Sequence, residues 1–190
     1  MSGPLFMEAE RVTFHPVEED DLEFLQTSIN HPDVREGLAA THPVNMAGER
    51  EWFESVDEDG VQFLLRADGE RVGTISFRTV SDAWGTAELG YFFHPDHWGN
   101  GYATDAARRM LEYGFAERRF DKLWARVLAF NEASMRVLEK AGFEHEATLS
   151  GQGYARGGRV DVERYGALAS EWEATAGTAA EGDSRDAGHR

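Results

Sequence analysis

Two glycines directly in front of a helical pattern place the tightest restriction on what this chain can fold into. The stretch HPDHWGNGYATDAARRML puts Gly99 and Gly101 before apolar positions that recur with helical spacing. Glycine adopts backbone angles that other residues disfavour, and the first turn of a helix carries unpaired amides at the positive end of its dipole. Such a turn predicts a site for a phosphate-bearing ligand.

The turn matches neither of two familiar phosphate loops. It lacks the Lys-Ser or Lys-Thr ending of a Walker A loop, and it lacks the full G-x-G-x-x-G pattern of dinucleotide-binding folds. A turn that uses glycine only for its backbone conformation is the alternative that this motif leaves open.

Charge narrows the class of partner. The 190 residues include 35 acidic and 19 basic side chains, which gives a net charge of -16, and lysine occurs only at Lys122 and Lys140. Such a chain repels nucleic acid and anionic membranes, so neither is an expected partner. An acidic excess with little lysine indicates a halophilic protein adapted to high salt, and an ordinary acidic cytosolic protein is the alternative.

Several kinds of site and segment are not expected, because the sequence lacks the residues that they need. It contains no cysteine, which removes disulfides, thiolate metal sites and a cysteine nucleophile. Its seven histidines have no paired ligand spacing, so we expect no metal site. No run approaches the roughly 18 apolar residues of a membrane span, and no signal pattern is evident. We therefore expect a cytoplasmic protein.

The periodicity predicts one mixed α/β (α+β) domain over residues 1–174, built on a single open sheet. Its expected elements are a strand near 12–14, helices near 18–29 and 45–56, three strands between 61 and 93, a helix over 103–118, a buried strand over 122–130, a helix over 131–141 closed by Gly142, and strands over 143–149 and 159–168. Residues 175–190 are small and polar, which predicts a disordered tail.

A second motif sharpens the interpretation. The stretch NEASMRVLEKAGF begins 30 residues after Gly101 and puts Asn131 at the end of the buried strand. The WGNGYA turn and the N-x-x-S-x-x-x-L-x-K-x-G-F helix together resemble the GNAT N-acetyltransferase superfamily over residues 10–168, with the RimJ/RimL branch the best fit. The resemblance implies a central, mostly antiparallel, splayed sheet flanked by about four helices, with acetyl-CoA as cosubstrate and no metal.

The resemblance also implies which residues bind coenzyme A. The family's diphosphate-binding turn falls on Trp98, Gly99, Asn100, Gly101, Tyr102, Ala103 and Thr104, with Trp98 in place of the usual Gln or Arg. The preceding strand is expected to bind the pantetheine arm through the backbone of Phe92, Phe93 and His94, with the strands separating beyond Pro95. Asn131 corresponds to an asparagine that touches pantetheine, and either Arg108 or Arg136 is expected to meet the outer phosphate.

The proton-transfer residues that are usual in the family are absent. The family's tyrosine acid falls on Leu138, and the glutamate base of the Rim-type branch falls on Gly153. Ser134 is then the expected acid and Glu88 the expected base. A serine that only caps its helix and a salt-bridged glutamate are the alternatives, and deprotonation through water is a further route.

The expected activity is direct transfer of an acetyl group from acetyl-CoA to a primary amine. A protein N-terminal α-amine is the first choice of acceptor and a small-molecule amine the second. The acidic segments DLEFLQ and EREWFESV are expected on the acceptor side, where they favour a cationic acceptor. A non-catalytic acyl-CoA-binding or sensing module is the alternative, and the family likeness also leads us to expect a homodimer.

Overall fold

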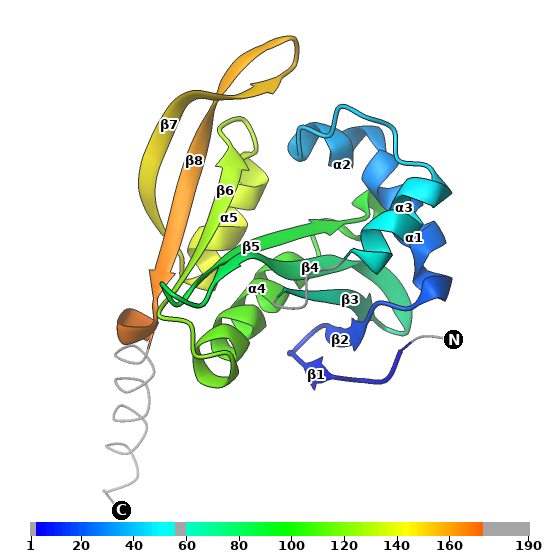
Figure 1. Cartoon of the computed structure of the whole chain (residues 1–190), viewed down its shortest axis with the longest axis horizontal. Coiled ribbons are helices and arrows are strands. Elements are labelled where there is room, and N and C mark those ends of the chain that lie inside the picture. Colours follow the sequence, from blue (N-terminus) through cyan, green and yellow to red (C-terminus); the bar gives the residue numbers. More distant parts are fainter. Residues whose placement is uncertain (1–2, 56–59, 173–190) are drawn as a thin grey trace, which may run out of the picture.

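A computed structural model describes residues 3–55 and 60–172, which form one open sheet with helices against it (Figure 1). The strand order is β1-β2-β3-β4-β5-β6-β8-β7, and all neighbours are antiparallel except β5 and β6. The strands are β1 (Met7–Glu8), β2 (Thr13–Pro16), β3 (Val61–Ala67), β4 (Glu70–Ser81), β5 (Thr86–Phe93), β6 (Lys122–Leu128), β7 (Glu144–Ala155) and β8 (Gly158–Leu168). The predicted mostly antiparallel mixed sheet is confirmed.

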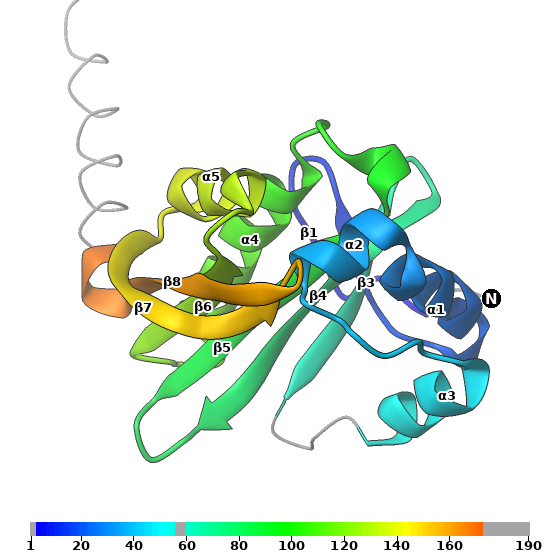
Figure 2. The ribbon, with the colours of Figure 1, turned by 90° about the horizontal axis from the view of Figure 1, so that it is seen from above.

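The helices fall into two groups. They are α1 (Leu22–Asn30), α2 (Pro32–Gly37), α3 (Met46–Glu54), α4 (Tyr102–Glu112) and α5 (Glu132–Ala141), with short turns η1 (Glu19–Asp21), η2 (Pro95–His97) and the π-helical η3 (Tyr113–Glu117). Figure 2 shows α4 and α5 side by side on one face of the sheet, whereas α1, α2 and α3 gather near the end formed by the N-terminal strands.

Two elements were not predicted, the short strand β1 and helix α2. Pro32 reads as the end of α1, but it occupies the first turn of α2, where a proline needs no amide partner. The side chain of His31 caps α2 by accepting a hydrogen bond from the amide of Asp33. Helix α2 therefore begins where a breaker was expected. The predicted tail at 175–190 lies outside the described residues.

Helix α4 forms the centre of the core. Its buried face consists of Ala106, Ala107, Met110 and Leu111, and the two alanines allow the helix to approach the sheet closely. Helix α5 contributes the fully buried Leu138 and ends at Gly142, which adopts φ 112 as the predicted C-cap. This packing fixes the first turns of α4 and α5 relative to the ends of β5 and β6.

Strands β5 and β6 separate after a short paired stretch. Their parallel pairing covers only Thr86 to Glu88 opposite Lys122 to Trp124, although both strands continue beyond it (Figure 1). The opening therefore begins after Glu88, much earlier than the expected point beyond Pro95. The unpaired edges of the two strands border a wedge-shaped opening in the sheet.

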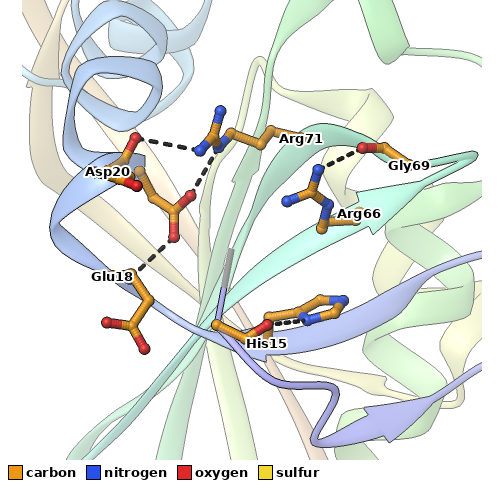
Figure 3. A network of polar contacts seen from close by, with 8 residues as sticks. His15, Glu18, Asp20, Arg66, Gly69 and Arg71 are labelled. Atoms are coloured by element: carbon orange, nitrogen blue, oxygen red, sulfur yellow. Dashed lines mark hydrogen bonds and ion pairs between the residues drawn. The ribbon is translucent and has the colours of Figure 1, made fainter. Parts of the chain in front are cut away.

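The N-terminal helices are tied to the sheet by a buried ion pair. Arg71 of β4 donates to the backbone carbonyl of Asp20 (Figure 3) and to the carboxylate of Asp21, at 3.2 and 2.7 Å. Asp21 is fully buried, and its other carboxylate oxygen accepts the amide of Glu18 to complete a capping box. Because a buried carboxylate needs such partners, this contact sets where α1 begins.

Candidate active site

A cavity of about 640 Å³ occupies the opening between β5 and β6. The turn before α4, the first turn of α5, helix α2 and the tip of the β7–β8 hairpin complete its wall. Its lining includes Phe92, Phe93, Trp98, Gly99, Gly101, Tyr102, Ala103, Thr104, Asn131 and Ser134, which were all predicted as site residues. The structure thus brings both sequence motifs to one cavity.

The glycine turn has the backbone geometry of an anion site. Gly99 and Gly101 adopt φ 80 and φ 79, and Gly101 is the N-cap of α4. The first helical hydrogen bond at this end runs from Asp105 N to Gly101 O, so the amides of residues 102–104 precede it and have no partner within the helix. Nothing lies within 4 Å of a side-chain position on Gly99. A turn with this geometry can hold a phosphate-bearing ligand.

Trp98 and Asn100 stabilise the turn from within. The indole Nε1 of Trp98 donates to the carbonyl of Phe93 at 2.9 Å, and Asn100 Nδ2 donates to the carbonyl of His97 at 3.1 Å. Asn100 is not among the residues that line the cavity. A tryptophan in place of the family's polar residue therefore connects the turn to the end of β5.

The edge of β5 limits which backbone groups can bind pantetheine. The amide of His94 donates to Val72 of β4, and residues along a strand alternate between its two edges. We infer that the amide of Phe93 faces the opening, while those of Phe92 and His94 face β4. The ring of His94 lines a second cavity of about 540 Å³ instead, together with Arg66 and Arg71.

Two cations of α5 line the cavity. Arg136 and Lys140 both line the cavity, one helical turn apart. Arg108 does not line it, because its guanidinium donates twice to the carbonyl of Lys140 at 3.1 and 2.7 Å. Of the two arginines considered from the sequence, the structure brings only Arg136 to the cavity, and Lys140 was missed.

Asn131 and Ser134 lie together at the N-terminus of α5. The side chain of Asn131 caps the helix by accepting the amide of Ser134 at 3.2 Å. The hydroxyl of Ser134 instead lies 2.7 Å from the phenol oxygen of Tyr91, a residue of β5 that sequence reasoning missed. Burial raises the pKa of Tyr91 to about 12, although the contact with Ser134 opposes the rise.

Glu88 lies where the opening begins, and both oxygens of its carboxylate accept hydrogen bonds. Its carboxylate accepts two hydrogen bonds from Arg126, at 2.9 and 3.1 Å, and one from Thr79 at 3.0 Å. The residue is 3% exposed and is not among those that line the cavity, whereas Arg126 is. These contacts match the salt-bridged alternative more closely than the role of a base.

Helix α2 covers the cavity and meets the β7–β8 hairpin across it. Arg156 at the hairpin tip donates to Glu36 of α2 at 2.6 Å and lies over the ring of Phe130. A side chain at Gly37 would come within 3.1 Å of Asn131 Nδ2, so the end of α2 packs closely on α5. The Arg156 guanidinium holds the pKa of Glu36 below its usual value. We call this ion pair the latch.

Arg78 of β4 brings a further cation to the cavity. It lines the cavity, and its guanidinium lies over Gly90, where a side-chain carbon would come within 2.3 Å of Nη2. Gly90 therefore provides the space for Arg78 to lie across β5. Within 3–55 and 60–172, no carboxylate pairs with Arg78.

The two acidic segments that were predicted on the acceptor side are not part of this cavity. Residues 21–26 and the described part of 49–56 do not line the cavity, and its two acidic side chains are Asp33 and Glu36 of α2. In the described part of the chain, no group of three or more His, Asp or Glu side chains is arranged to bind a metal. No helix there is both long and apolar enough to cross a membrane.

Comparison with known proteins agrees with this architecture. Residues 11–144 match the family model described as an acetyltransferase (GNAT) domain. The N-acetyltransferase YoaA of Bacillus subtilis, whose function is uncharacterized, is 36% identical over 96 residues, which cover 50% of this chain and 54% of that protein. Spermidine N(1)-acetyltransferase of Escherichia coli K12 is 29% identical over half of each chain. The chain thus spans about half the length of these curated relatives.

Solved structures share the fold over most of this chain. Spermidine N-acetyltransferase of Vibrio cholerae, in complex with CoA and spermine, superposes with a TM-score of 0.80 at 21% identity, over 84% of this chain and 96% of that one. RimL, an α-N-protein acetyltransferase of ribosomal L7/L12 in complex with coenzyme A, gives 0.79 at 16% identity, over 87% and 98%. Because the family model covers well over half of its residues, the chain belongs to the GNAT acetyltransferase family.

Proposed function

We propose that this protein transfers the acetyl group of acetyl-CoA directly to an α-amine at a protein N-terminus. The amides of residues 102–104 would hold the diphosphate, the amide of Phe93 the pantetheine arm, and Arg136 and Lys140 an outer phosphate. The acceptor amine would enter on the side of Arg78 and α2. No covalent acyl-enzyme is needed, since the chain has no cysteine.

The charge of the cavity carries the choice of acceptor. Five basic side chains line it, Arg78, Arg126, Arg136, Lys140 and Arg156, against the acidic Asp33 and Glu36. Three of the five pair with carboxylates, Arg126 with Glu88, Arg136 with Glu132 and Arg156 with Glu36, so Arg78 and Lys140 are the basic side chains of the lining without a carboxylate partner among the described residues. Glu36 is already bound by Arg156, so only Asp33 is left to attract a cation.

A polyamine would fit the acceptor side poorly, because its further cationic nitrogens would meet the guanidinium of Arg78, which pairs with no carboxylate of the described residues. A single amine with a neutral or acidic remainder fits better. Arg78 is then placed to meet a carboxylate of the acceptor, such as an acidic side chain near the N-terminus of a peptide. These considerations favour an acceptor of the RimL kind over one of the spermidine kind.

For catalysis we assign Ser134 as the donor of a proton to the leaving thiolate. We assign Glu88 to holding Arg126, and the amine loses its proton to water. Glu88 as a base remains the competing assignment, which Glu88→Gln distinguishes by its pH profile.

The experiment measures the coenzyme A thiol that is released from acetyl-CoA in the presence of each acceptor. The acceptors are spermidine, peptides whose second residue is acidic or basic, and free amino acids. It is run in both low and molar salt, as the acidic composition requires. We expect the acidic peptides to be the best acceptors. Arg78→Glu should lower their kcat/KM about tenfold and raise that of spermidine, consistent with the loss of one charged hydrogen bond.

The control is Arg119→Glu, which makes the same change in charge at an exposed position outside the cavity. It should leave the acceptor preference unaltered. Equal effects of the two variants would argue against a role for Arg78 in selecting the acceptor. Tight binding of acetyl-CoA without turnover on any amine would instead favour the sensing module.

A further inference from the structure

We infer that Tyr91 is a positioning residue that presents the hydroxyl of Ser134 to the leaving sulfur and restores its proton. The inference rests on the proposed function and concerns the same site. Tyr91 comes from the free edge of β5 and Ser134 from the first turn of α5, and both line the cavity. Their oxygens lie 2.7 Å apart, within hydrogen-bond distance.

The hydroxyl of Ser134 is not needed to cap its helix. Asn131 already accepts the amide of Ser134, which removes the usual structural reason for a serine in a first turn. The contact that the structure gives to this hydroxyl is the phenol of Tyr91. The phenol also lies 3.4 Å from the carbonyl of Ser134, a weaker acceptor on the same residue.

Two hydrogen-bond arrangements follow from these distances. When Tyr91 donates to Oγ of Ser134, the serine proton is left to point into the cavity. When Tyr91 donates to the serine carbonyl, the serine proton turns back toward the phenol. The 2.7 Å contact accommodates either oxygen as the donor, and our inference takes the first arrangement, in which Ser134 is ready to donate.

Tyr91 also supplies a phenol next to α5, a helix that has no tyrosine of its own. The family's phenol falls on Leu138, whose side chain is fully buried one turn beyond Ser134. Here a phenol reaches the same helix from the facing strand. Because the opening begins at Glu88, Tyr91 lies on the part of β5 that no longer pairs with β6.

The proton balance of the step is complete. The acceptor nitrogen forms a bond to the thioester carbonyl carbon and releases its proton to water. The carbon–sulfur bond breaks, its electron pair stays on sulfur, and sulfur takes the proton of Ser134. Ser134 takes the proton of Tyr91, and water returns one to the phenol.

The relay helps because a phenol is a stronger acid than an aliphatic hydroxyl. Serine alone would be left as an alkoxide after donating, whereas the relay leaves the charge on the ring of Tyr91. Burial raises the pKa of Tyr91 to about 12, which makes this phenol a weaker acid than an exposed one, although it is protonated at neutral pH in either case.

A double-mutant cycle tests the inference with Tyr91→Phe, Ser134→Ala and the combination. We expect each single change to lower kcat about tenfold to a hundredfold, with the KM for acetyl-CoA within about twofold, as for the loss of a proton donor. The double variant should be no slower than the singles, because both residues serve one proton. Ser134→Thr, which keeps a hydroxyl, should recover most of the rate.

Two further readouts separate this role from a structural one. The solvent deuterium isotope effect on kcat should fall in Tyr91→Phe, and CoA affinity and melting temperature should stay near those of the parent. Tyr154→Phe is the matched control, since it removes an exposed phenol at the β7–β8 hairpin. It should leave kcat and the isotope effect unchanged.

The outcomes distinguish this inference from the proposed function. If the parent protein acetylates peptides but Tyr91→Phe retains the parent kcat, or if the two single effects multiply in the double variant, the role of Tyr91 is overturned while the activity stands. If the parent releases no thiol with any amine, the proposed function fails and the relay fails with it.

Discussion

Glu88 and Arg126 form a two-pronged ion pair at the point where β5 and β6 separate. Arg126 Nε and Nη2 donate to the two carboxylate oxygens of Glu88 at 2.9 and 3.1 Å. Pairing between the strands ends where Glu88 faces Trp124. Arg126 lies two residues after Trp124 on β6. The ion pair therefore spans the start of the opening that becomes the cavity.

Glu88→Gln should weaken this connection without altering the pH–rate profile. The free energy of unfolding should fall by about 1–2 kcal/mol, less than for a fully buried pair because the Arg126 side chain is half exposed. Urea unfolding and the pH dependence of kcat/KM measure the two effects. Loss of the acidic limb of the profile would restore Glu88 as the general base.

Gly101→Ala should impair coenzyme A binding through the backbone. Alanine at φ 79 costs about 1 kcal/mol in any protein, and here the strain also displaces the first amides of α4. We expect the Kd for coenzyme A to rise at least tenfold by calorimetry. Gly69→Ala is the control, because Gly69 has φ 84 and nothing within 4 Å of a side chain, but lies outside the cavity between β5 and β6. An equal loss of affinity in both variants would contradict the diphosphate assignment.

The latch between Glu36 and Arg156 should affect acceptor binding more than stability. Both side chains are largely exposed, so Glu36→Gln should shift the melting temperature little while raising the acceptor KM about threefold at unchanged kcat. Reversing both charges, with Glu36→Arg and Arg156→Glu, should restore KM.

The latch should also weaken in acid. Arg156 lowers the pKa of Glu36 in the folded state. The stabilisation that the ion pair provides is therefore present above the ordinary glutamate pKa of about 4.3, and it is lost as the pH falls through the lower folded value. Hydrogen exchange at the hairpin tip should then become equal in the parent and Glu36→Gln. A difference that persists below that range would indicate that the ion pair does not hold the hairpin.

Tyr91 should be visible in an alkaline titration. Its pKa is raised from 10.0 to about 12 by burial, so the folded protein keeps this proton while the unfolded chain loses it. The free energy of unfolding should therefore fall as the pH rises from about 10 to about 12, and Tyr91→Phe should lack this component. Phenolate absorbance compared between the parent and this variant measures the pKa directly. If the absorbance difference between the parent and Tyr91→Phe titrates near pH 10, the phenol of Tyr91 is exposed to water.

Most of the fold could be predicted because each element carries its own local signal. The α4 turn has its glycines, α5 has a capping asparagine and a closing glycine, and the strands between 61 and 93 have clear turn residues. Helix α2 escaped prediction because Pro32 fits both the end of one helix and the start of the next. The place where β5 and β6 separate depends on tertiary packing, which no local pattern near Pro95 records.

The site could be predicted most completely where it is built from backbone. Turn residues such as Gly101 are identified by conformation, and the cavity contains most of them. The side-chain partners come from elements far apart in sequence, as with Tyr91 and Ser134 or Glu36 and Arg156. A signal for Tyr91 was present in the sequence, since it follows Glu88 on the same strand and the phenol expected at Leu138 is missing.

The most direct test of the central claim is thiol release from acetyl-CoA by the purified protein, with mass spectrometry of the acceptor, over the panel of peptides and amines. Our account predicts stoichiometric release of coenzyme A and acetylation of a peptide α-amine, with acidic peptides preferred to spermidine. It would be contradicted by tight coenzyme A binding with no acetylated product from any acceptor, or by spermidine as the best acceptor.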